Sequence, residues 1–103
     1  MILVRVSLLS LIACGAIACC DRAAVPDQLQ KLYSSQAKER NKAALALAKC
    51  GDLAEPAVPR LAALLYDSNV GVQSSAAYAL REIGSPQAVK AIEKAEAARA
   101  RRK

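Results

Sequence analysis

The chain has 103 residues, which is enough for one domain. Hydrophobic residues make up 54% of it, mainly Ala, Leu and Val, with three Tyr and neither Phe nor Trp, so the core is expected to be thin. The net charge is +6, and because the sequence has neither a histidine nor a CxxC pair, it offers nothing for a zinc site or a dithiol redox motif.

Residues 1–20 have the pattern of an export signal. Arg5 is their one charge, and an uncharged run follows from Val6 to Cys20. At about 1.5 Å per residue this run would cover roughly 22 Å of helix, less than the ~30 Å hydrocarbon layer of a membrane. We therefore predict a signal peptide over residues 1–18, with an uncleaved anchor as the alternative.

Two segments within this region resemble the lipobox of bacterial lipoproteins, in which a cysteine is lipidated and becomes the new N-terminus. One precedes Cys14 and the other precedes Cys19. We prefer Cys19, because it leaves a signal of more ordinary length, and keep Cys14 as the second choice. Ala16-Ile17-Ala18 would also suit ordinary signal peptidase, which would release a soluble periplasmic protein.

Cleavage before Cys19 would leave three cysteines, Cys19, Cys20 and Cys50. An oxidising compartment permits a bridge between Cys20 and Cys50. Cys50, however, falls at the buried end of a predicted apolar stripe, where a free cysteine behaves as a small hydrophobic residue. The sequence alone therefore favours a core thiol over a disulfide.

Five helices are predicted after a linker at residues 19–24. The first begins near Val25, with Pro26 in its first turn, and the second runs from about Gln36 to Cys50 and ends at Gly51. Ser34 and Ser35 supply capping hydroxyls for the second helix.

The third helix should end at Tyr66, and Pro59 should either start it or kink it. The fourth is the clearest. It is predicted over Val70–Ile83, with Asn69 as its N-cap and Gly84 as its stop. Ser85-Pro86 then starts the fifth helix.

An internal repeat of 33 residues relates these helices. Ala24–Gly51 and Ala57–Gly84 share eleven identities in 28 aligned positions without a gap. The apolar stripe of the fourth helix therefore recurs in the second. Such a period is typical of stacked helical arrays, in which each unit buries its face against the next. The apolar positions and repeat residues that carry the resemblance below are Leu65, Asp67, Asn69, Val72, Ala76, Ala77, Ala79, Leu80, Ile83 and Gly84.

These residues resemble the HEAT-like repeat in its short, phycobilin-lyase-related form, over roughly Ala24 to Lys94. The resemblance implies an all-α fold, a short α-solenoid of HEAT-like helix pairs with about five helices after the signal segment. We place the repeat domain at residues 25–95. Two helix pairs plus one terminal helix fall short of the three repeats that usually give independent stability, so we expect marginal stability or self-association.

In this family an Asp at the end of the first helix and an Arg six residues later help to join stacked repeats. Here the pair is split, because Asp67 is followed by Gln73 and Ser34 by Arg40. We therefore expect the polar ladder between repeats, and the rigidity that it gives, to be weakened.

The terminal helix is expected to bury Val89 and Ile92 and to cap the array with polar residues such as Glu96. A basic tail follows over residues 96–103. Its cations suit a solvated helix C-terminus, and the alternative is adhesion to anionic lipid. We do not expect nucleic acid as a partner, because no aromatic stacking residues accompany the charge. The tail residues are Arg99, Arg101, Arg102 and Lys103.

Catalysis has few candidate residues. The carboxylates Asp52, Glu55, Asp67 and Glu82 are scattered, and no pair has a spacing that would place both in an evident pocket. We therefore predict no enzyme activity, no cofactor and no metal.

Function should then depend on a surface. The resemblance implies that the second helix of each pair lines the concave side, where we predict a site for a partner protein. Leu45 and Tyr78 occupy the same repeat position there, although such a Tyr more often packs on its neighbour. The residues of this predicted surface are Asn41, Leu45, Lys49, Ser74, Tyr78 and Arg81.

The sequence thus predicts a protein-binding scaffold that is exported and lipid-anchored in a bacterial envelope. The alternatives are a truncated array with a structural or self-association role, and an accessory subunit of a lyase-type enzyme.

Overall fold

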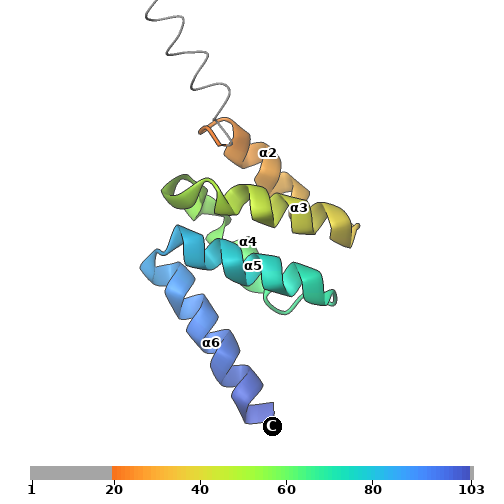
Figure 1. Ribbon diagram of the computed structural model, residues 1–103, viewed down its shortest axis with the longest axis vertical. Coiled ribbons are helices and arrows are strands. Elements are labelled where there is room, and N and C mark those ends of the chain that lie inside the picture. The colour runs from red at the N-terminus through yellow and green to blue at the C-terminus, as the bar shows by residue number, and fades with distance from the viewer. Residues whose placement is uncertain (1–19, 103) are drawn as a thin grey trace, which may run out of the picture.

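The computed structural model describes residues 20–102, which form an array of helices (Figure 1). The described residues contain no strand. The elements in chain order are α2 (Ala24–Lys31), α3 (Ala37–Ala48), the 3-10 helix η1 (Gly51–Ala57), α4 (Val58–Leu64), α5 (Val70–Ile83) and α6 (Pro86–Arg102).

The helices stack as two pairs and a terminal helix. α2 and α3 form the first pair, α4 and α5 form the second, and α6 packs against both α5 and α4. α3 and α5, the second helices of their pairs, lie side by side and make the most extensive helix contact (Figure 1). This is the predicted all-α solenoid of helix pairs, in which each repeat packs on the next.

α5 follows its sequence pattern closely. Val72, Ala76, Ala79, Leu80 and Ile83, the predicted stripe, are all buried. At its N-terminus the Asn69 side chain accepts a hydrogen bond from the Val72 N–H at 3.0 Å. At its C-terminus Gly84 has a φ of 66°, in the left-handed region that glycine adopts without strain. Both predicted ends of this helix are confirmed.

The core is continuous through both pairs and consists mainly of leucines and alanines. The alanines let the helices approach closely, while the leucines fill the space between them. The largest fully buried side chains are Leu32, Leu47, Leu61, Leu64, Leu80 and Val72.

The prolines divide the predicted third helix into two elements. Pro56 lies inside η1, whereas Pro59 lies in the first turn of α4, where its missing N–H costs no helical hydrogen bond. Pro59 therefore starts the helix, as one of the two expected outcomes. The helix ends at Leu64, and Leu65 and Tyr66 form a turn after it.

α6 begins as predicted, since the Ser85 hydroxyl accepts a hydrogen bond from the Ala88 N–H at 3.1 Å. Its buried face differs from the prediction. Ala88 and Ala95 are buried and Ile92 is partly buried, but Val89 is 43% exposed. The alignment with the third helix predicted that Val89 lies in the core. The packing of α6 on α5 instead orients the helix so that Ala88 is buried and Val89 faces solvent.

None of the helices within residues 20–102 combines the length and the apolar character needed to span a membrane.

Candidate functional site

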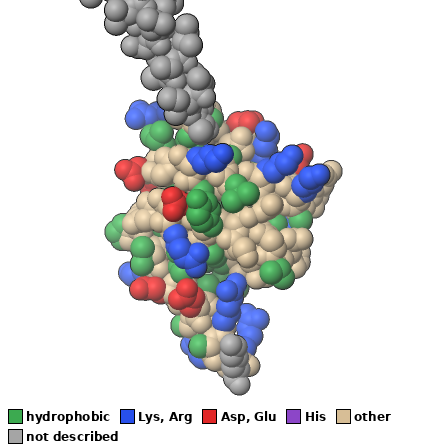
Figure 2. All heavy atoms as spheres, in the orientation of Figure 1, with side chains coloured by type: hydrophobic (Ala, Val, Ile, Leu, Met, Phe, Trp, Pro, Cys, Tyr) green, Lys and Arg blue, Asp and Glu red, His purple; other side chains and the backbone are tan. Residues whose placement is uncertain are grey.

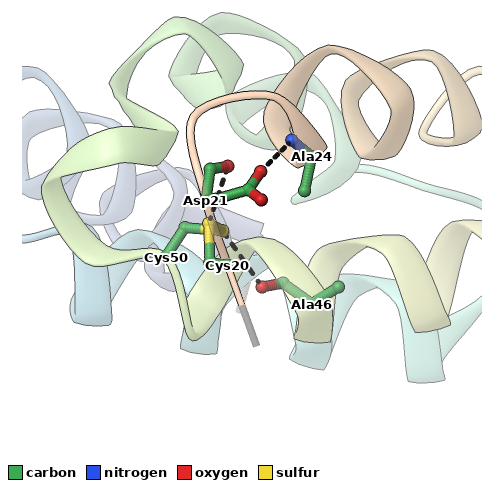
Figure 3. The surroundings of a disulfide bond; sticks show 5 residues. All are labelled: Cys20, Asp21, Ala24, Ala46 and Cys50. Carbon is green, nitrogen blue, oxygen red and sulfur yellow. Dashed lines mark hydrogen bonds between the residues drawn. A yellow bond between two sulfur atoms is a disulfide. The ribbon is translucent and has the colours of Figure 1, made fainter. Parts of the chain in front are cut away.

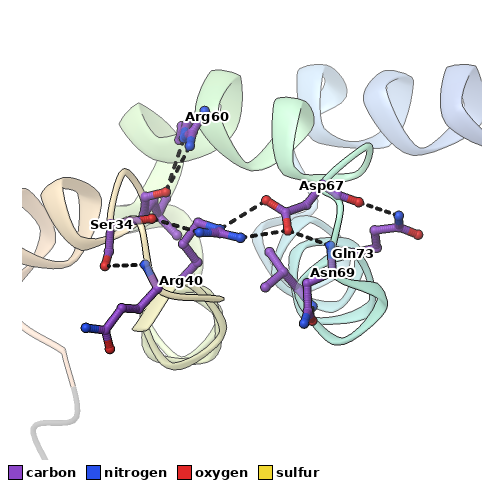
Figure 4. Close-up of polar contacts among 9 residues, drawn as sticks. Ser34, Arg40, Arg60, Asp67, Asn69 and Gln73 are labelled. Atoms are coloured by element: carbon purple, nitrogen blue, oxygen red, sulfur yellow. Dashed lines mark hydrogen bonds and ion pairs between the residues drawn. The ribbon is translucent and has the colours of Figure 1, made fainter. Parts of the chain in front are cut away.

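An ion pair joins the two helix pairs. Arg40, in the first turn of α3, donates from Nε and Nη2 to the two carboxylate oxygens of Asp67, each at 3.0 Å (Figure 4). Its Nη1 donates to the Ser34 carbonyl at 2.8 Å. Both charged side chains are about nine-tenths buried, so the pair is largely shielded from solvent.

The expectation of a weakened polar ladder was wrong. Because neither repeat contains both the Asp and the Arg, the sequence suggested that no ion pair could form. The ion pair, however, joins one repeat to the next. It needs only an Arg in the first pair and an Asp in the second, which are Arg40 and Asp67. Gln73, which stands where an Arg was expected, donates to the Asp67 carbonyl instead.

Arg60 forms a second connection between the pairs. From α4 it donates through Nε and Nη2 to the Leu32 carbonyl at the end of α2, at 3.2 and 3.1 Å (Figure 4). A cation at this position satisfies a terminal carbonyl and also interacts with the helix dipole. The Arg60 guanidinium lies 4.3 Å from the centre of the Tyr33 ring, which adds a cation–π contact.

These contacts set the ionisation of Asp67. Burial raises the pKa of its carboxyl, but four effects lower that pKa. They are the Arg40 hydrogen bond, the bond from the Asn69 N–H, and the charges of Arg40 and Arg60. The lowering effects win, so the pKa of Asp67 lies below its usual value.

A disulfide joins Cys20 to Cys50, with their Cα atoms 5.1 Å apart (Figure 3). The preference for a core thiol was therefore wrong. Cys50 lies beyond the end of α3 and is only partly buried, which leaves its sulfur accessible to the segment that precedes α2. The Ala24 N–H donates to the Asp21 carboxylate at 2.8 Å (Figure 3). The turn at residues 20–23 is therefore held by both the disulfide and this hydrogen bond.

The predicted partner surface lies on α3 and α5. Leu45 is 40% and Tyr78 is 48% exposed, although both are apolar or aromatic. Figure 2 shows hydrophobic side chains among basic ones on the face that these helices present in that view. Of the other predicted residues, Lys49, Ser74 and Arg81 are exposed, and Asn41 is half-buried.

A family comparison matches HEAT repeats over residues 13–102. The chain belongs to the HEAT repeat family. No curated protein and no solved structure gives a significant match. The HEAT repeats of this chain are therefore the two helix pairs and the terminal helix α6.

Asn41 has a structural contact within the HEAT array. Its side-chain oxygen accepts a hydrogen bond from the hydroxyl of Ser75, a buried residue of α5. Asn41 thus helps to hold α3 against α5 at the margin of the predicted surface. Ser75 and Arg60 were both missed from sequence. For Ser75 a signal existed, because it places a hydroxyl beside the apolar stripe of α5, three residues after Val72 and four before Ala79.

The predicted lipidation sites Cys19 and Cys14 lie outside the described residues, as does Lys103 of the basic tail. Arg101 and Arg102 are exposed at the end of α6. Arg99 differs from them, because its guanidinium donates to the Gln73 side chain at 3.3 Å and so connects α6 to α5.

Within residues 20–102, Cys, Asp and Glu side chains form no cluster of three that could hold a metal ion. Of the four carboxylates considered for catalysis, Asp67 serves the ion pair between repeats.

Proposed function

We propose that this chain is a non-enzymatic protein-binding scaffold, exported and lipid-anchored through Cys19 in a bacterial envelope. The observation that carries the binding role is the recurrence of Leu45 and Tyr78. They occupy one repeat position on neighbouring helices and are both about half exposed. HEAT arrays commonly serve as interaction scaffolds, and Tyr and Arg are enriched among the residues that dominate binding energy at interfaces.

Site-specific photo-crosslinking in cells that produce the protein tests this surface. A photoreactive amino acid at Tyr78 should give a discrete adduct of higher mass, and Leu45→Ser in the same chain should reduce it. Tyr33 is the matched control, because it is also an exposed tyrosine but lies against Arg60. Equal adducts from both positions, or none from Tyr78, would argue against this surface.

The anchor rests on the lipobox-like residues before Cys19 and is tested separately. Mass spectrometry of the membrane fraction should find a diacyl-modified N-terminal cysteine that is absent from Cys19→Ser. A modification that survives Cys19→Ser but disappears in Cys14→Ser would move the site. An unmodified soluble product from wild type would support release into the periplasm instead.

The structural alternative, self-association of a short array, is favoured by its two-and-a-half-repeat length. Sedimentation velocity across a hundredfold concentration range distinguishes the two, since a scaffold for another protein should remain monomeric. The relation to the short, lyase-related HEAT form rests on the repeat residues alone, and we propose no lyase role from it.

A further inference from the structure

A second surface lies between the first helices of the repeats. A groove of about 590 Å³ runs between α4 and α6. Alanines from both helices form much of its lining, and its polar and aromatic groups come from Tyr66 after α4 and from one side of α6. The α6 side chains are Gln87, Lys90 and Lys94.

The charges of α6 are separated by sign. At 100° per residue, Lys90, Lys94 and Arg101 fall within an arc of about 40°, along about 16 Å of the helix. Glu93 and Glu96 fall on the flank turned away from the groove. Within the described part of the chain, neither Lys90 nor Lys94 forms a salt bridge, and no carboxylate lines the groove. The groove therefore carries uncompensated positive charge.

The groove is held in shape by contacts on the other side of α6. Ala88 and Ala95 are buried against the array, the Ser85 hydroxyl caps the helix, and Arg99 is bonded to Gln73. A partner would not have to order α6 on binding, which lowers the entropic cost of association.

The comparable groove between α2 and α3, of about 500 Å³, is different in charge. Lys31, Lys38 and Lys42 line it, but Glu39 lies among them, and Lys31 is paired with Asp27 at 3.4 Å. Its positive charge is partly compensated. This groove provides a control of matched residue type and spacing.

We propose that the α4–α6 groove binds an acidic amphipathic helix of a partner protein. Carboxylates at i and i+4 of that helix would face Lys90 and Lys94, which have the same spacing, and an apolar side chain would contact Tyr66. The alanine lining lets a helix backbone approach closely, as in other helix-in-groove complexes. The cations fix its register and speed its association.

Charge spacing argues against a second copy of this chain as the occupant. No two carboxylates within residues 20–102 are four residues apart, so no described helix presents the required pair. A flat lipid surface would meet the exposed Arg101 and Arg102 at the end of α6 but would not enter the groove between the helices. Neither conclusion depends on export or on a lipid anchor.

The test uses the full chain and a synthetic probe. The probe is an alanine-based 18-residue helical peptide, blocked at both ends. It has Glu at positions 4, 8, 11 and 15, and Leu next to these on the same face of the helix. Two-dimensional NMR of the labelled protein should show saturable shifts at Tyr66, Lys90, Ala91 and Lys94, with a Kd between about 10 μM and 1 mM. The shifts should weaken as salt rises from about 0.05 to 0.5 M.

Variants then separate a specific site from general attraction. Lys90→Glu with Lys94→Glu should weaken the peptide at least tenfold, whereas Lys38→Glu with Lys42→Glu, which has the same net charge, should change its affinity by less than twofold. Tyr66→Ala should weaken it about threefold or more. A probe with Gln in place of Glu should not bind.

Four outcomes would overturn the proposal. One is the absence of concentration-dependent shifts at these residues up to 1 mM peptide in low salt. Another is an equal loss in both double variants, which would indicate non-specific attraction. The third is binding of phosphatidylglycerol vesicles, without peptide binding, that is lost in Lys90→Glu with Lys94→Glu, which would assign the groove to lipid. Shifts confined to α3 and α5 would likewise contradict it, while leaving the proposed scaffold function intact.

Discussion

Arg40 and Asp67 belong to different helix pairs, and their bidentate ion pair, with both N–O distances at 3.0 Å, is the main polar connection between the two repeats. Each partner also organises its own loop. Arg40 holds the Ser34 carbonyl before α3, and Asp67 accepts the Asn69 N–H before α5 at 2.9 Å. The stacking of the repeats and the entry of the chain into both second helices therefore depend on the same two side chains.

Arg40→Ala should lower the free energy of unfolding by about 3 kcal/mol, because it leaves the carboxylate of Asp67 buried without its partner. Arg40→Lys should recover only part of this loss, since an ammonium cannot make both bonds in the planar geometry. Urea unfolding followed by circular dichroism measures both. A double-mutant cycle with Asp67→Asn should show coupling above 1 kcal/mol, and additive effects would contradict the role given to the pair.

Acid should remove the contribution of Asp67. Its pKa in the folded chain is held below the unfolded value of about 3.9, so the unfolded chain binds more protons as the pH falls. The contribution is complete above about pH 5 and is lost as the pH falls through the folded pKa. The difference in unfolding free energy between wild type and Asp67→Asn should be constant from pH 5 to 7 and shrink below pH 4. A difference that is as large at pH 2.5 as at pH 5 would contradict the assignment.

Reduction of the disulfide should destabilise the chain by about 3 to 4 kcal/mol, because the Cys20–Cys50 bridge spans 30 residues and restricts the unfolded state. Cys20→Ala and Cys50→Ala should each lose a similar amount, and reductant should then have no further effect on either. Thermal melts with and without reductant provide the measurement. Rapid alkylation of both thiols in the native, unreduced protein would show that the bridge does not form.

Leu80→Ala should lower the free energy of unfolding by about 2 to 5 kcal/mol, since Leu80 is fully buried in the C-terminal part of α5. Leu45→Ala is the control, because it removes the same atoms from an exposed site on α3 and should cost less than about 1 kcal/mol. If the two substitutions have equal effects on the melting temperature, Leu45 is part of the core and the proposed partner surface is wrong. Leu80→Ala with the disulfide reduced should be unfolded at 37 °C.

Local signals predicted the most regular part of the fold. α5 has an Asn cap, an uninterrupted stripe and a glycine stop, each of which acts through neighbouring residues, and each was confirmed. The array itself was predictable because the 33-residue period relates two segments without a gap. The buried face of α6 was harder to predict, since its small apolar residues allow more than one face to be buried. Contact with α5 determines which face is buried.

Long-range relationships were not predictable in the same way. The stripe position of Cys50 indicated burial, but helix α3 ends at Ala48, and a periodicity argument does not apply beyond that end. The Arg40–Asp67 pair was judged within each repeat, whereas it forms between them. On the partner surface, the exposure of Leu45 and Tyr78 agrees with the helical phase, but the bond from Ser75 to Asn41 required knowledge of how α3 and α5 pack.

The disulfide also limits how far the domain could move from a membrane. With a lipid on Cys19, the next residue is already fixed to the end of α3, and consecutive Cα atoms are only about 3.8 Å apart. Such a protein would have almost no flexible linker between its lipid and its folded domain. Its domain could not reach partners far from the membrane. It would instead diffuse in the plane of the bilayer, with its repeats held against the headgroups. Its partners would then be molecules that come to the bilayer or are already embedded in it, and reducing the disulfide would free only the short turn of residues 20–23 before α2, because α2 is packed on α3.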